Sequence, residues 1–387
     1  MPANSERPDM KRLKTSFLTL SILTFLGFSS CDSGGDSPSD DDNNNLDQTA
    51  FLGNIGENLI LGGYEDFSSD AEDLDNAANS FVNTPNLDNL EILRDAWLEA
   101  SLSWQRVAFY NFGPAENSAI LTINFYPTNT SLIEDNIING PGSYNLQTAG
   151  ATFAKGFPAL DYLLFGAADT DEGIVEKFST SDNAKTYLTD LTANIYALAD
   201  GVYNNWSPEG SNYLETFKHN KGTSSGSSLS LMVNAWSQYM EIHVRNAKIG
   251  TPNGNSVASS QRLGPFPEKA EAYYSGESLA LLKEAHNALQ EFYLGISHNG
   301  TDGVGIHNLL EELNAQDGTL ATDYKAMFEG VTTDLNAING TLLETIENNG
   351  EDITEIFNDY RAIIALLKVD VVSALSISIT YADNDGD

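Results

Sequence analysis

The stretch DAWLEASLSWQRVAFYNF, residues 95–112, decides the fold class. Its polar side chains recur at steps of four, four, three and four residues, which is the spacing of one face of an α-helix. These side chains are Asp95, Glu99, Ser103, Arg106 and Tyr110. Trp97 and Trp104 lie on another face, and Gly113-Pro114 ends the predicted helix.

The same helical period returns along most of the chain. It covers residues 181–206, 229–248 and 276–294, and it ends in a long C-terminal helix. The apolar stripe of that last helix consists of Ile353, Phe357, Tyr360, Ile364, Leu367 and Val371. The sequence therefore predicts an all-α protein built from two packed helical bundles.

A polar stretch separates the two predicted bundles. Residues 207–228, SPEGSNYLETFKHNKGTSSGSS, are rich in Ser and Gly, and we interpret them as a linker. The predicted N-terminal bundle then spans residues 47–206, and the C-terminal bundle spans residues 229–387.

The charge balance of the chain is strongly acidic. Lys and Arg number 19 against 55 Asp and Glu, which gives a formal net charge of −36. Nucleic-acid binding needs clustered cations, so this composition argues against a nucleic-acid partner. A solvated acidic surface is the simplest interpretation, and attraction of cations or basic ligands is the alternative.

The N-terminus has the features of a targeting segment. Lys11, Arg12 and Lys14 precede an apolar run over residues 17–28, which is shorter than the roughly 20 residues of a membrane span. Cys31, the sole cysteine, follows small residues as in a bacterial lipobox. We predict a lipoprotein signal peptide over residues 1–30 and a lipid anchor on Cys31. A plain secreted protein with an incidental cysteine is the alternative.

The predicted signal peptide leads into an acidic tether. Residues 31–46, CDSGGDSPSDDDNNNL, are polar and cannot pack a core. We therefore expect an outer-membrane lipoprotein in the cell envelope of a Gram-negative bacterium, facing either the periplasm or the cell surface.

One acid stands in an apolar surrounding in GFPALDYLLFG, residues 156–166. Gly156 and Pro158 favour a helix start, which places Asp161 about one turn into the helix. A buried carboxylate needs a partner or a raised pKa, and Arg106 on the Trp-rich helix is the expected partner. A structural ion pair, a ligand-facing acid and an exposed acid stay open as interpretations.

Several segments, taken in order, resemble the imelysin family. They are the Trp-rich helix ending in FGPAE, INFYP (123–127), KGFPALDYLLFG (155–166), LMVNAWSQYMEIHVRNAKIGTP (231–252), EAYYSGESL (271–279) and ITYADNDGD (379–387). The resemblance implies two helical bundles with a cleft near their interface. It also implies a link to iron uptake, and some imelysins are described as insulin-cleaving peptidases.

The chain departs from the family's proposed metal motif, G-x-H-x-x-E. Gly156 is kept, but Pro158 stands at the His position and Asp161 at the Glu position. Because proline offers no side-chain ligand, a metal held by imidazole and carboxylate cannot form on this motif. No catalytic residue is therefore predicted, and Asp161 alone is left as a possible metal ligand.

Five polar side chains are our candidates for the lining of the cleft that the resemblance implies, and a helix-packing or capping role is the alternative for each. These ligand-binding candidates are Arg106, Asp161, Glu271, Tyr274 and Ser275. We expect a non-enzymatic binding protein for a small ligand, iron, another divalent metal, haem or an iron- or haem-uptake partner. A metallopeptidase with ligands outside the motif and a structural or adhesion-type surface protein are the alternatives.

Overall fold

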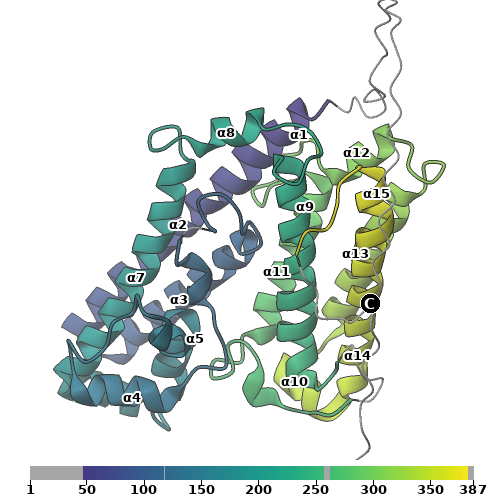
Figure 1. Ribbon diagram of the computed structural model, residues 1–387. Helices are drawn as coiled ribbons and strands as arrows, with labels where there is room; N and C mark the ends of the chain where they lie inside the picture. The colour runs from purple at the N-terminus through teal and green to yellow at the C-terminus, as the bar shows by residue number, and fades with distance from the viewer. Residues whose placement is uncertain (1–46, 117, 257–261, 382–387) are drawn as a thin grey trace, which may run out of the picture. The chain divides into compact units, whose positions relative to one another are not determined.

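The computed structural model describes residues 47–116, 118–256 and 262–381. Helices carry the fold in these ranges, and an isolated β-bridge joins Ile296 and Asp302 (Figure 1). The predicted all-α class is confirmed. The predicted signal peptide, the acidic tether and Cys31 lie outside the described residues.

The N-terminal half is built around three long helices, with α2 packed against both α3 and α7. The α-helices of this half are α1 (Thr49–Asn54), α2 (Gly62–Asn83), α3 (Leu87–Val107), α4 (Thr130–Asn139), α5 (Gly156–Asp161), α6 (Asp171–Thr180), α7 (Asp182–Trp206) and α8 (Tyr213–His219). Two π-helical segments, η1 (Ile55–Leu61) and η4 (Tyr162–Gly166), and two 3₁₀ segments, η2 (Ile120–Ile123) and η3 (Ala149–Ala154), complete it.

Side-chain caps fix the starts of several of these helices. Asn86 accepts a hydrogen bond from the Asn89 N–H ahead of α3, and Ser181 accepts one from Ala184 ahead of α7. Each cap satisfies a backbone donor that has no partner inside the helix. The helix predicted over residues 95–112 corresponds to the second part of α3, which ends at Val107.

The C-terminal half packs α11 against α13 and the π-helical segment η5, with α14 covering η5 and α13. Its α-helices are α9 (Ser228–Gln238), α10 (Thr251–Asn253), α11 (Ser278–Leu294), α12 (Ile306–Glu312), α13 (Leu320–Ala337), α14 (Leu342–Leu366) and α15 (Val372–Ala374). The remaining segments are η5 (Tyr239–Gly250), the 3₁₀ turn η6 (Pro267–Lys269) and the π-helical η7 (Leu367–Val371).

The stretch predicted as a linker contains a helix. Within residues 207–228, α8 buries Leu214 and Phe217 next to Gly56 of η1. The two halves also meet where α11 packs against α3. The predicted domain limits stay predictions. In the described ranges we find no helix that combines the length and apolarity needed to cross a membrane.

Candidate functional site

The GFPALDYLLFG stretch folds as α5 followed by η4, as its glycines and proline predict. Gly156 has φ +71°, and a Cβ there would lie 1.8 Å from the Ile123 carbonyl oxygen. Only glycine fits such a position without strain. Trp97 of α3 donates a hydrogen bond to the Phe157 carbonyl, which holds this short helix against α3.

Asp161 is buried, with 2% of its surface exposed, and its carboxylate is fully engaged by backbone. Its two oxygens accept hydrogen bonds from the N–H groups of Tyr274 (2.9 Å) and Ser275 (3.0 Å). Burial raises the pKa of Asp161 to about 6, although these hydrogen bonds oppose the shift. Asp161 therefore clamps the segment before α11 onto α5.

The predicted ion pair between Asp161 and Arg106 is wrong. The Arg106 guanidinium pairs instead with Glu284 of α11, with Nε 2.5 Å from Oε1. On α3, Trp97, Ser101 and Gln105 face Asp161, four residues apart. Arg106 follows Gln105 by one residue, so it points about 100° away around the helix.

Glu271 is the second buried acid near Asp161, and it too is engaged. It is 4% exposed and accepts hydrogen bonds from Gln105 (3.0 Å) and Asn124 (2.6 Å). Its other oxygen pairs with the Lys248 ammonium group. Burial lowers the pKa of Lys248, and the charge of Glu271 opposes that shift.

The structure thus brings four of the five predicted site residues together and leaves one apart. Asp161, Glu271, Tyr274 and Ser275 gather around α5, whereas Arg106 lies on another face of α3. The space between Asp161 and Glu271 is about 10 Å³, which is enough for about one water molecule. The space between these two acids is a structural joint, too small for an organic ligand. Pro158, Asp161 and Tyr274 also line a separate cavity of about 300 Å³.

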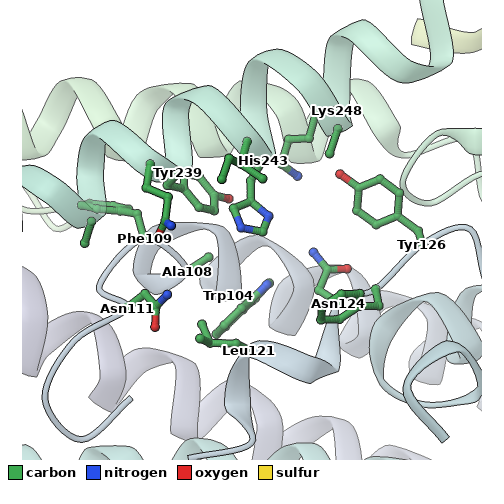
Figure 2. Close-up of a pocket in the computed structure, with 15 residues that line it drawn as sticks. Trp104, Ala108, Phe109, Asn111, Leu121, Asn124, Tyr126, Tyr239, His243 and Lys248 are labelled. Atoms are coloured by element: carbon green, nitrogen blue, oxygen red, sulfur yellow. The ribbon is translucent and has the colours of Figure 1, made fainter. Parts of the chain in front are cut away.

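A much larger cavity, of about 390 Å³, opens beside this joint (Figure 2). One wall comes from the end of α3 and the segment around η2, and it carries Trp104, Phe109 and Asn124. The opposite wall is η5, from which Tyr239 and His243 project toward Trp104. Ligand cavities measure roughly 300–1,000 Å³ and are mostly apolar with a few polar groups, which fits this one.

His243 is the notable titratable group of the large cavity. Its ring stacks on Tyr239, with centroids 5.2 Å apart, and the residue is exposed at the cavity. Burial, and after it the nearby charge of Lys248, lowers the pKa of His243 to about 4. The imidazole is therefore neutral near pH 7, the form that binds metals or exchanges hydrogen bonds.

The remaining polar groups of the large cavity are partly unsatisfied. The buried side-chain oxygen of Asn111 has no hydrogen-bond partner among the described residues. Lys248 also lines the cavity, but Glu271 already balances its charge. The cavity thus offers a neutral imidazole, an orphan amide oxygen and aromatic walls, with no uncompensated charge on its lining.

Sequence reasoning missed this cavity. His243 and Lys248 lie within LMVNAWSQYMEIHVRNAKIGTP, which carries part of the family resemblance, but neither was singled out. The available signal was the pair Tyr239 and His243, four residues apart in an apolar helix. In the residues that the structure describes, no three His, Cys, Asp or Glu side chains are grouped so that they could hold a metal ion.

The comparisons with known proteins agree with this architecture. The imelysin family model matches residues 60–367, and the chain therefore belongs to the imelysin family. Iron-regulated protein A of Synechococcus elongatus is 22% identical over 311 residues, covering 76% of this chain and 75% of that protein. The resemblance drawn from the sequence is confirmed.

Two solved structures share the fold. A protein described as an iron-regulated protein A precursor, from Parabacteroides distasonis, aligns with a TM-score of 0.67 at 17% identity. It covers 87% of this chain and 97% of its own. An imelysin-like protein from Psychrobacter arcticum aligns with a TM-score of 0.64 at 17% identity, covering 86% of this chain and 97% of its own.

Proposed function

We propose that this protein is a non-enzymatic binding protein of the cell envelope, which takes up a flat, largely apolar iron complex such as haem. The observation that carries the proposal is the cavity of about 390 Å³ with a neutral imidazole, His243, in its wall. Haem iron accepts an imidazole as axial ligand, and aromatic side chains suit the faces of its ring. The name of the Synechococcus relative, iron-regulated protein A, supports an iron setting.

The state of the motif residues supports binding over hydrolysis. Pro158 has no ligand atom in its side chain, and both oxygens of Asp161 are engaged by backbone N–H groups. Glu271 is engaged by Lys248, Gln105 and Asn124. A metallopeptidase centre built on these acids would first have to break those contacts, each of which satisfies a buried group.

Thermal unfolding with and without haem tests the proposal. Haem that binds the folded state must stabilise it by mass action, by about 2.7 kcal/mol at a hundred times its Kd. Ala247→Trp places a large ring in the cavity lining and is expected to abolish the shift in Tm. Ala362→Trp, at an exposed position of α14, is the matched control and should keep it. An equal Tm shift in the Ala247→Trp variant would place haem elsewhere.

We also propose that the protein is anchored through a lipid on Cys31. The support is the lipobox-like sequence around the sole cysteine and the acidic stretch after it. Cells fed a labelled fatty acid should label the wild-type protein, and Cys31→Ala should remove the label and release the protein from the membrane fraction. Membrane retention of an unlabelled Cys31→Ala protein would contradict the anchor.

A further inference from the structure

A second cavity, of about 90 Å³, lies on the other side of the segment that follows α3. Phe109 and Asn111 line the large cavity, whereas Tyr110 between them lines the small one. The rest of its wall comes from η1 and the start of α2, from the C-terminal part of α11, and from residues 297–299. Among the described residues, the two cavities share no lining residue.

The small cavity has an excess of negative charge. Glu65, Asp66 and Glu291 line it, together with the Arg106 guanidinium. Arg106 is already compensated by Glu284, so the lining sets three carboxylates against one imidazole, that of His298. The His298 Nδ1 lies 3.6 Å from Glu284 and 3.9 Å from Glu291.

One polar group of this cavity, the Tyr110 hydroxyl, lacks a hydrogen-bond partner in the described ranges. The Tyr110 ring packs against Phe112 and Phe292 and the residue is 2% exposed, yet its hydroxyl makes no hydrogen bond there. Burial and, after it, the charge of Glu291 hold the pKa of Tyr110 well above the ordinary value. The Glu291 side chain is 29% exposed and lies 3.9 Å from the His298 imidazole. Buried polar groups without partners are uncommon and call for an explanation.

The size of the cavity limits what could supply the missing partner. A water molecule needs about 10–15 Å³ of such space, and an engineered cavity of about 150 Å³ holds benzene. A cavity of about 90 Å³ therefore holds a small group of heavy atoms. Leu59 and Ala288 give it carbon walls beside the carboxylates.

We propose that this second cavity binds a primary alkylammonium ion, the charged end of a short amine. The ammonium group donates hydrogen bonds to the Glu291 carboxylate and the Tyr110 hydroxyl, while its carbons contact Leu59 and Ala288. An ammonium carries three donors and no acceptor, which matches the Tyr110 hydroxyl and the Glu291 carboxylate in an acidic cavity. This site is independent of the haem proposal, since it uses none of the large cavity's residues.

Isothermal titration of ethylammonium chloride into the purified protein, at constant ionic strength, tests the proposal. We expect saturable binding that weakens at least about tenfold in Glu291→Gln, because a charge-assisted hydrogen bond is lost. Tyr110→Phe should weaken it about threefold or more. Glu347→Gln removes the same charge from an exposed position of α14 and should leave the affinity unchanged.

The outcomes that overturn the proposal are equally specific. Absence of saturable heat from ethylammonium would remove the site, and equal weakening in Glu347→Gln would reduce it to nonspecific attraction by the acidic surface. Calcium chloride that binds with loss in Glu291→Gln and displaces ethylammonium would make it a metal-ion site. Circular dichroism of each variant confirms that it is folded, and the conservative Tyr110→Phe keeps the test decisive if Glu291→Gln fails to fold.

Discussion

Asp161 is buried and His243 opens to the large cavity, and loss of water around each group shifts their pKa values in opposite directions. Burial disfavours the charged form of each group, so the pKa of Asp161 rises to about 6 and that of His243 falls to about 4. Asp161 has two backbone donors, which compensate for its loss of water. His243 faces a cavity and stays neutral at pH 7. The acid therefore holds the fold together, and the imidazole is left free for a ligand.

The clamp formed by Asp161 makes a prediction about stability. Asp161→Ala leaves two backbone N–H groups unsatisfied in a buried place, and it should lower the free energy of unfolding by about 2–4 kcal/mol. Asp161→Asn keeps one acceptor and should cost less. Urea unfolding of both variants measures the difference. A double-mutant cycle should give no more than about 0.5 kcal/mol between Asp161 and Arg106. A coupling well above that value would restore the ion pair that the sequence suggested.

The raised pKa of Asp161 also predicts a pH dependence. The carboxyl group has a pKa of about 6 in the folded protein against 3.8 unfolded, so between these values the folded state binds more protons. Its stabilising contribution is complete below about pH 4 and is lost as the pH rises through about 6. Between pH 4 and pH 7, the free energy of unfolding of the wild type should therefore fall by roughly 2–3 kcal/mol relative to that of Asp161→Asn. A difference independent of pH would contradict the raised pKa.

At the scale of elements, the π-helical segment η5 positions the main polar side chains of one wall of the large cavity. It continues α9 without a break and carries Tyr239, His243 and Lys248. π-Helical segments are rare and are frequent at functional sites. The wider turn changes which side chains share a face, so a helical period read from the sequence does not locate this wall.

The sequence predicts those features of the fold that depend on local signals, and it does not predict those that depend on contacts between distant residues. Helix periods and breakers predicted α7, α11 and the start of α5 to within two residues, because those signals are local. The partners of Arg106 and Asp161 depend on which helix packs where, and Glu284 and the Tyr274 N–H are more than a hundred residues away. The family resemblance grouped Glu271, Tyr274 and Ser275 with Asp161, and in the structure the four residues lie around α5 as parts of a structural joint.

The Lys248–Glu271 pair gives a prediction at this scale, because it ties η5 to the segment before α11. Both side chains are 4% exposed, so Lys248→Met leaves a buried, uncompensated carboxylate. The loss should be about 3–5 kcal/mol, whereas Lys248→Met combined with Glu271→Leu should recover much of it. Chemical denaturation of the single and double variants measures both values. A double variant as unstable as the single one would mean that the contacts of Glu271 with Gln105 and Asn124 matter more than the ion pair.

At the scale of the whole molecule, the large cavity lies where side chains of the N-terminal half meet η5 of the C-terminal half. The chain has a net charge of −36, yet the lining of this cavity has no uncompensated charge. Such a contrast favours an apolar ligand in the large cavity and leaves cations to the acidic surface and the second cavity. Membership of the imelysin family and the shared fold of two solved structures fit this arrangement.

The measurement that tests the central claim most directly is a haem titration followed by absorption spectroscopy. Wild type should saturate at one equivalent with the spectrum of an imidazole-ligated haem. His243→Ala should lose that spectrum, and His219→Ala, which changes an exposed histidine on α8, should keep it. Identical spectra and affinities in wild type and His243→Ala would contradict the assignment of this cavity as the haem site.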